Sequence, residues 1–493
     1  MSHQVCEAAV AKPRAAPSFR IVALIVATAL FMEQLDATVL ATALPTMARD
    51  FDVSAPVMSI ALTSYLLSLA IFIPASGPIA DNFGSRTVFR TAIAIFMAGS
   101  LFCAVAPNLL LLVFARLLQG MGGAMMIPIG RLVLLRSVAR KDMVSAMTWF
   151  LVPALIGPIV GPPLGGFIVT YLDWRWIFYI NVPIGILGMI LVSVFIEDFR
   201  NQTKVPFDTV GFVLSGIALG SLLFGFEMAS HPGEGMFSIF LISIGLIFGI
   251  AYLRHARRHP APIMDFSLMK VPSFGTSVIA GSLTRITQGA QPFLLPLLFQ
   301  LGFGLSAAKA GQIVLATAVG ALLMKAVGAK IFRKFGFRTS LIVNGVGASL
   351  GYGLCAAFRP DWPVALIFLV LVTGASFMSL RFTAYNTVAY DEIAPERMSS
   401  ATSFYTTLQQ LMLSLGICVG ALVLNSSMTF HGNVHPKIED FSLAFVVVTT
   451  ISLLATIWNL RFSPTAGAEL SGHRRAAVAT EAANDDQQTR SAA

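Results

Sequence analysis

The chain has 493 residues, of which 56% are hydrophobic and only 12% are charged, and its mean hydropathy is +0.78. Soluble proteins have about 45–50% apolar and about 25% charged residues. A soluble chain of this composition would leave too much apolar surface in water, so most of the chain must lie in lipid. The net charge of +9 therefore concerns the two sides of a membrane, and we expect no nucleic-acid partner.

Fourteen membrane spans are predicted when about 20 mainly apolar residues are taken as one span. An even number of spans places both termini on one side. Of the 33 Lys and Arg residues, 23 fall in the loops and tails of that side, 5 in loops of the other side and 5 within spans. Because basic residues concentrate on the cytoplasmic side, we predict a multi-pass protein of the bacterial cytoplasmic (inner) membrane with both termini cytoplasmic. The spans lie near residues 20–45, 57–79, 88–106, 109–135, 144–170, 175–196, 209–229, 235–253, 273–300, 308–329, 339–357, 363–388, 401–427 and 441–461.

A repeated motif divides the spans into two halves. Residues 83–87 read FGSRT after span two, and residues 335–339 read FGFRT after span ten, at an offset of 252 residues. Transporters are commonly built from such repeats, with substrate bound where the halves meet. We therefore predict an all-α membrane protein with two six-helix bundles, 20–200 and 271–462, and two inserted helices within 201–270. Cytoplasmic tails are expected at 1–19 and 463–493, the second one disordered.

The loop after span two and the whole of span five carry conformational motifs. In the loop, glycines permit a tight turn and Asp81 can pair with a basic group and lock one conformation. In the second copy of the repeat, Arg333 stands where Asp81 stands in the first. In span five, small residues let helices approach closely while prolines bend the helix. The motif residues are Gly77, Asp81, Gly84 and Arg86 in the loop, and Gly157, Pro158, Gly161, Pro162, Gly165 and Gly166 in span five.

These motifs, in this order, resemble the signatures of the major facilitator superfamily over roughly residues 20–462. RLLQGMGG at 116–123 is similar to the fourth-span motif of the superfamily, and GPIVGPPLGG at 157–166 resembles its exporter motif. LDATV at 35–39 and DWRWIF at 173–178 are similar to the fourteen-span drug:proton antiporters of the EmrB/QacA type, most of all to the MdtD branch. The resemblance implies the major facilitator fold, alternating access, and proton-coupled export without a cofactor.

Charged residues within spans are candidate functional residues, because an unpaired charge at the bilayer centre costs several kcal/mol. Asp36 is the predicted proton carrier, with Glu33 one turn earlier on nearly the same face. The resemblance implies a proton-coupling role for Arg116, and the alternative is a structural hydrogen bond to backbone carbonyls. The repeat offset places Glu33 opposite Arg285 and predicts that they pair across the cleft. The predicted substrate-binding residues are Arg285, Arg381, Arg131, Lys325 and Gln119.

The leading hypothesis is a proton-coupled exporter for multidrug efflux. The alternative is an exporter of small organic anions such as citrate or an iron-citrate chelate, because the bases within spans outnumber the acids. An ATP-driven pump is excluded by the lack of a GxxxxGK[ST] motif, and no HExxH or GxSxG motif suggests an enzyme. The Cys and His spacing predicts no metal site. Expected partners are the lipid bilayer and a small-molecule substrate; the expected unit is one chain, and a periplasmic accessory protein and uptake instead of export stay open.

Overall fold

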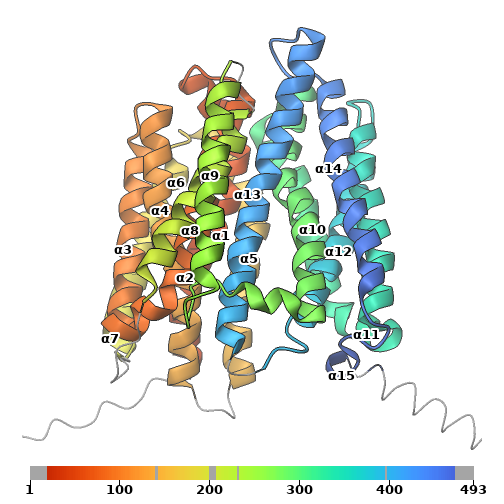
Figure 1. Ribbon diagram of the computed structural model, residues 1–493. Coiled ribbons are helices and arrows are strands. Elements are labelled where there is room, and N and C mark those ends of the chain that lie inside the picture. The colour runs from red at the N-terminus through yellow and green to blue at the C-terminus, as the bar shows by residue number, and fades with distance from the viewer. Residues whose placement is uncertain are drawn as a thin grey trace, which may run out of the picture.

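The computed structural model describes residues 19–138, 143–198, 207–229, 233–394, 397–471 and 473. The regular structure of these residues is helical, without strands, and the long helices run up and down along one common direction (Figure 1). The predicted tail 1–19 lies almost wholly outside the described residues, as does most of the predicted tail 463–493. The helices are α1 (Phe19–Asp50), α2 (Ser59–Phe83), α3 (Ser85–Ala104), α4 (Leu109–Ser137), α5 (Met143–Tyr171), α6 (Trp176–Tyr179), α7 (Asn181–Phe195), α8 (Thr209–Ala229), α9 (Gly235–Ala256), α10 (Pro272–Leu297), α11 (Ala307–Gly353), α12 (Val364–Val388), α13 (Met398–His431), α14 (Ile438–Trp458) and α15 (Ala468–Ser471).

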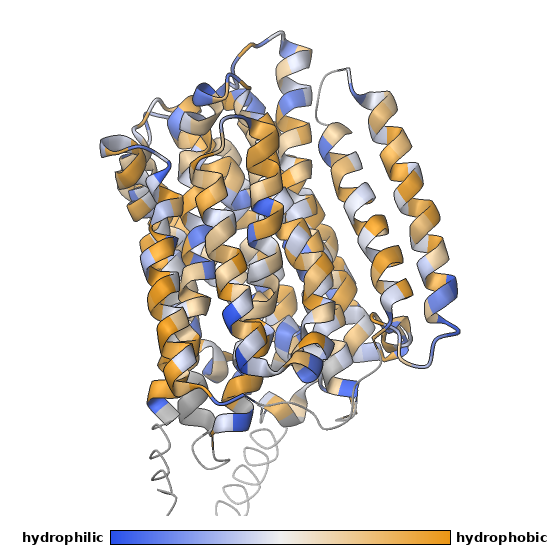
Figure 2. Ribbon diagram, turned by 90° about the vertical axis from the view of Figure 1, so that its left-hand side faces the viewer, coloured by the Kyte–Doolittle hydropathy of each residue, from blue (hydrophilic) through white to orange (hydrophobic). Residues whose placement is uncertain are grey.

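Eleven helical segments of the described chain are long and apolar enough to cross a membrane. Figure 2 shows hydrophobic residues over most of the length of the helices, with hydrophilic residues gathered mainly at the two ends. The large exposed side chains include Phe114, Ile190, Phe240, Leu350 and Leu369, as expected for a lipid-facing surface. The chain is therefore a multi-pass membrane protein. Three predicted spans are missing from this count: α10 is not among the eleven segments, the apolar stretch Ile156–Tyr171 of α5 is too short to enter it, and α11 is counted once.

Two glycines of the repeated motif break the chain at equivalent places. Gly84, with φ 92°, separates α2 from α3, and Gly336, with φ 71°, divides α11 into two arms. Both values lie in the left-handed region that glycine adopts without steric strain. The two positions differ by the predicted offset of 252 residues, so the repeat has a physical counterpart in two sharp interhelical breaks. The predicted loop between spans ten and eleven is thus a single non-helical residue.

The two halves contact each other through pairs of helices that the repeat makes equivalent. In one contact α5 packs against α11, and in the other α13 packs against α2. The inserted helices α8 and α9 pack along each other, and α8 also contacts α2 and α13. The inserted pair therefore lies beside one of the two seams between the halves (Figure 1).

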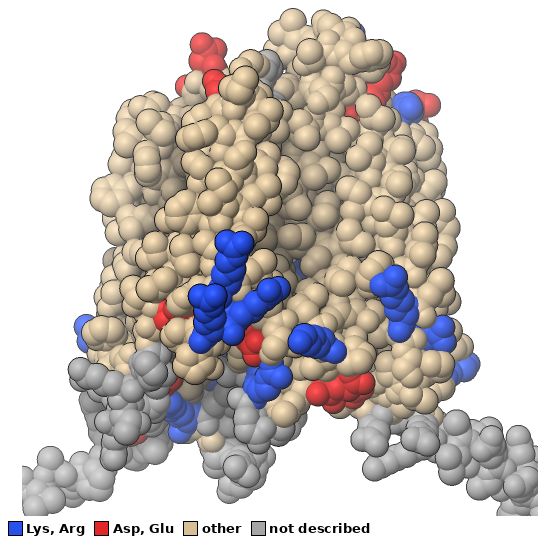
Figure 3. Space-filling view, in the orientation of Figure 1, with Lys and Arg blue, Asp and Glu red and all other residues tan. Residues whose placement is uncertain are grey.

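Charged side chains are distributed unevenly along the helix direction. On the face drawn in Figure 3, most Lys and Arg side chains lie toward the lower end, and acidic side chains stand out at the upper end. The lower end is the one at which α1 begins and α15 lies (Figure 1). The basic end of this face is therefore the end at which α1 begins and at which α15 lies.

Candidate functional site

A cavity of about 830 Å³ lies between the two halves. Its walls come from α1, α4, α5, α10, α11 and α12 and are mainly apolar. Among the described lining residues, Arg131 and Lys325 carry charge, whereas Gln34, Gln288 and Gln291 supply amide groups. This volume and this mixture of apolar wall and few polar groups are typical of a small-molecule site.

The two halves close over the cavity at the end opposite to the start of α1. There Gln300 Nε2 donates to the carbonyl of Thr42 at 3.0 Å, and the amide of Ala308 donates to Thr170 Oγ1 at 3.0 Å. α5 and α11 approach so closely that a Cβ on Gly166 would lie 2.3 Å from the carbonyl oxygen of Ala307. The cavity therefore extends from this seal toward the end at which α1 begins, where Arg131 and Lys325 line it.

Asp36 lies at the centre of a buried polar network. Arg116 Nη1 donates to Asp36 Oδ2 at 2.6 Å, and both side chains are almost fully buried. Gln119 Nε2 donates to Asp36 Oδ1 at 2.8 Å, and Asn181 Nδ2 donates to the same oxygen at 3.0 Å. Ser100 Oγ accepts from both amides, at 2.7 and 3.1 Å. The network joins α1, α3, α4 and α7 within the first half of the chain.

Arg116 is held in addition by backbone and aromatic contacts. Its Nε donates to the carbonyl of Ala61 at 2.9 Å, and its guanidinium lies 4.3 Å from the centre of the Tyr65 ring. Within the described part of the chain, four buried polar atoms in or near this network lack a hydrogen-bond partner: Glu33 Oε2, Tyr65 Oη, Arg116 Nη2 and Asn181 Oδ1. Such atoms are rare in folded proteins, so this region is a strong candidate for a functional site.

The structure places the other predicted residues in different surroundings. Arg285 donates to Gln288 Oε1 at 2.9 Å and to Gln409 Oε1 at 2.8 Å, and it stacks on the Phe382 ring. The predicted pair between Glu33 and Arg285 is therefore not formed in this conformation. Arg285 neighbours the cavity through Gln288 and Phe382, which line it.

Arg381 and Gln119 are fully buried and lie away from the cavity lining. Arg381 Nη1 donates to Ser452 Oγ at 2.9 Å, and its Nε donates to Tyr385 Oη at 3.3 Å. Gln119 belongs to the network around Asp36, one turn from Arg116 on α4. Of the five predicted substrate-binding residues, the structure thus brings Arg131 and Lys325 to the cavity wall.

The predicted loop motif forms an ion pair between α2 and α4. Arg136 Nη2 lies 3.0 Å from Asp81 Oδ1, with both side chains about a quarter exposed. The backbone amide of Arg86 donates to Asp198 Oδ1 at 3.1 Å, and the exposed Gly77 has no heavy atom within 4 Å of an added Cβ. The pair ties two helices of the same half.

The span-five motif brings α5 into contact with both α1 and α11. A Cβ on Gly157, Gly161 or Gly165 would lie within 3 Å of α1, and a Cβ on Gly166 would meet α11. Pro158 and Pro162 line the cavity. Gly157, Gly161 and Gly165 therefore form a stripe that packs α5 against α1, the helix that carries Asp36. Gly166 packs α5 against α11 of the other half.

Glu227 is a buried acid within the inserted helix pair. It lies on α8 and accepts hydrogen bonds from Ser59 Oγ and from Thr63 Oγ1, both on α2. Cys418 Sγ of α13 donates to Glu227 Oε2 at 3.1 Å. An inserted helix thus ties together two helices that belong to different halves. The sequence signal was the presence of an acid within a span, but it could not indicate the partners.

We expect Glu227→Ala to loosen this tie, because two hydroxyls and one thiol lose a buried acceptor, at about 1–3 kcal/mol for each unsatisfied group. Cys418 should become more reactive toward a maleimide in the purified protein, measured by mass spectrometry in a Cys6→Ser background. Buried Cys103, in the first half, serves as the internal control. An unchanged alkylation rate at Cys418 would contradict the proposed tie.

Comparison with known proteins places this geometry in a family. The sequence profile described as Major Facilitator Superfamily matches residues 26–417. A protein of Escherichia coli O6:H1, named "Putative multidrug resistance protein MdtD", is 34% identical over 435 residues, which cover 88% of this chain and 91% of the relative. The protein of the same name from Citrobacter koseri is 36% identical over 402 residues, which cover 81% of this chain and 85% of the relative.

Solved structures share the fold at low sequence identity. A D-xylose-proton symporter has a TM-score of 0.64 at 15% identity, with 90% of this chain and 98% of that chain covered. The peptide transporter POT in complex with sulfate has a TM-score of 0.67 at 12% identity, covering 90% and 95%. The human organic anion transporter MFSD10 (TETRAN) has a TM-score of 0.61 at 13% identity, covering 90% and 100%.

Proposed function

Because the chain belongs to the major facilitator superfamily, in the branch of the MdtD proteins, we propose that it exports small molecules by proton-coupled alternating access, with multidrug efflux as its activity. It is a transporter and no enzyme. The proposal rests on the buried ion pair between Asp36 of α1 and Arg116 of α4. α1 also lines the cavity through Gln34 and Thr38. The proton gradient supplies the energy, and no cofactor takes part.

Protonation of Asp36 is the proposed coupling step. An ionised Asp36 only accepts hydrogen bonds, and it receives them from Arg116, Gln119 and Asn181. A protonated carboxyl is itself a donor and has lost its charge, so this set of donors no longer fits it. Disrupting a buried ion pair costs about 3–5 kcal/mol, which is enough to shift a conformational equilibrium by two orders of magnitude or more. Proton binding can thereby change how α1 packs on α4 and α7.

The glycine stripe of α5 offers a route from this network to the cavity. α1 is packed between the network on one side and Gly157, Gly161 and Gly165 on the other. Gln34 and Thr38 lie on α1 next to Asp36 and line the cavity. A shift of α1 would therefore alter the cavity wall and the closeness of α5 to α11 at the seal.

We further propose fourteen spans, with α5, α10 and the second arm of α11 added to the eleven counted helices. Both termini are placed in the cytoplasm of a bacterium and the chain in the inner membrane, which agrees with the basic end of the face in Figure 3. In this orientation the closed end faces the periplasm and the conformation faces inward. One chain is the proposed working unit.

The charges at the cavity wall support the anion alternative, with citrate or an iron-citrate chelate as examples. Arg131 and Lys325 are both basic, and no described lining residue is acidic. Cation exporters would be expected to present acids and aromatic rings to their substrates, whereas guanidinium and ammonium groups bind carboxylates.

Replacement of Arg131 and Lys325 by Gln distinguishes the two substrate classes. If anions are carried, we expect at least a tenfold loss of transport for citrate, measured with radiolabelled substrate in vesicles, and little change for a lipophilic cation. Arg359→Gln, at an exposed residue outside the cavity lining, is the matched control. Equal losses for anion and cation would remove the charge argument and leave both bases with a structural role.

A further inference from the structure

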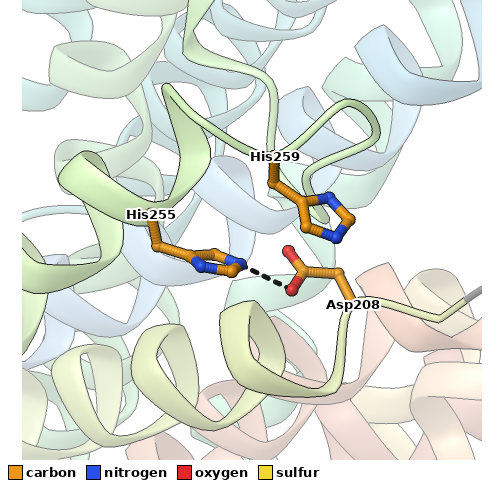
Figure 4. A group of neighbouring side chains, drawn as sticks. All are labelled: Asp208, His255 and His259. Carbon is orange, nitrogen blue, oxygen red and sulfur yellow. Dashed lines mark hydrogen bonds and ion pairs between the residues drawn. The ribbon is translucent and has the colours of Figure 1, made fainter.

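Two histidines and an aspartate meet at one end of the inserted helix pair. Asp208 precedes α8, His255 lies in the last turn of α9, and His259 follows one turn later. His255 Nε2 lies 2.7 Å from Asp208 Oδ1, and one ligand atom from each of the three residues lies within 4.8 Å of the others. Figure 4 shows the carboxylate between the two imidazole rings.

The three side chains are held in place by the surrounding backbone. The amide of Gly211 donates to Asp208 Oδ1 at 2.8 Å, which caps the start of α8. The amides of Arg258 and His259 donate to the carbonyl of His255 at 2.9 and 3.0 Å, so the helical turn continues through both histidines. Their ring centres lie 5.2 Å apart. The backbone therefore brings Asp208 and the two imidazoles close together, but not yet into the spacing of a bound ion.

Asp208 retains capacity as a ligand. Its Oδ2 receives only a long contact of 3.4 Å from the amide of Ile263, which is near the limit of a hydrogen bond. An oxygen of the Asp208 carboxylate is therefore available to a ligand beside the two imidazoles.

We propose that Asp208, His255 and His259 form a binding site for one divalent transition-metal ion of the Zn²⁺ type. Imidazole nitrogen and carboxylate oxygen are common Zn²⁺ ligands at about 2.0–2.2 Å, and three protein ligands with a water complete a tetrahedral site. Two atoms on such an ion lie about 3.4 Å apart. Binding therefore requires the 2.7 Å contact between Asp208 and His255 to widen and His259 to move inward. It also competes with the Ala261 amide, which donates to His259 Nδ1 at 3.2 Å.

The ion would be a bound structural ion and not a transported substrate, because none of its three ligands lines the cavity. It would join the start of α8 to the end of α9 and so fix the inserted pair that ties α2 to α13. Sequence spacing predicted no metal site because Asp208 is 47 residues from His255, and only the antiparallel packing of α8 on α9 brings them together.

The test is Zn²⁺ binding to the full chain, purified in detergent with an affinity tag that lacks histidine and measured by titration calorimetry. We expect one tightly bound ion per chain and at least a tenfold weaker affinity in His255→Gln and in His259→Gln. His435→Gln, a histidine outside the cluster, should bind as the unmodified chain does.

Co²⁺ provides a second readout, since its visible absorption reports tetrahedral coordination and should be lost in both cluster variants. Because His259→Gln leaves the Asp208 cap and the Asp208–His255 bond in place, it keeps the test independent of folding. The proposal is overturned if the unmodified chain binds no Zn²⁺ saturably, if all variants bind it equally, or if His435→Gln weakens binding as much as the cluster variants do.

Discussion

Asp36→Asn is expected to reduce proton-driven transport to background while the protein still inserts and still exchanges substrate down its gradient. Asparagine keeps the size of the side chain and can accept a hydrogen bond from Arg116, but it can neither bind nor release a proton near neutral pH. The measurement is uphill accumulation in energised inside-out vesicles against downhill exchange in vesicles without a gradient.

Asp50→Asn is the matched control for Asp36, because Asp50 lies at the other end of the same helix and is exposed. It should transport as the unmodified chain does. If Asp36→Asn kept uphill transport, Asp36 would have no part in coupling, and the network around Arg116 would be structural only.

Gly166→Val should produce the second large effect, by disfavouring the seal between the halves. An added Cβ would lie 2.3 Å from the carbonyl oxygen of Ala307. Because this oxygen belongs to the backbone, the clash can be relieved only if α5 moves away from α11. Overpacking of this kind costs about 1–3 kcal/mol, which lowers the population of the closed end by about 5- to 150-fold. We expect at least a tenfold loss of transport with the protein still folded.

The effect of Gly166→Val on the seal can be measured by cross-linking Thr170→Cys to Ala308→Cys, which replaces a contact between α5 and the start of α11. Gly220→Val is the control, since a Cβ there meets no heavy atom within 4 Å. Cross-linking should fall in the Gly166 variant alone. Equal cross-linking in both variants would show that the close approach at Gly166 does not govern closure.

Much of the fold could be predicted from the sequence, because a bilayer requires long apolar helices and because the repeated motif can be recognised in the sequence. Gly84 and Gly336 are predicted as equivalent, and both adopt the left-handed backbone that ends one helix and begins the next. The residues do not show that α11 continues through its break without a loop. In the structure Gly336 is the residue whose backbone angles leave the helical region between the two arms.

Sequence analysis predicted several residues of the candidate site, but it did not predict which of them pair with each other. Asp36 and Glu33 share nearly one face of α1, yet only Asp36 meets Arg116, because the crossing of α1 with α4 decides which carboxylate the guanidinium reaches. The repeat makes Glu33 and Arg285 equivalent in sequence but does not bring their charges together, and Arg285 binds two glutamines instead. Asn181 donates to Asp36. It was not predicted, because it is uncharged and the prediction relied on charged residues within spans.

The most direct measurement of proton-coupled export is the pH response of energised inside-out vesicles to added substrate. A lipophilic cation, citrate, and citrate with iron are added in turn to vesicles with the unmodified chain and with Asp36→Asn. We expect at least one compound to release protons from the acidic lumen of the unmodified vesicles and none to do so from the Asp36→Asn vesicles. Substrate accumulation without any proton release, or the same release from both vesicles, would contradict it.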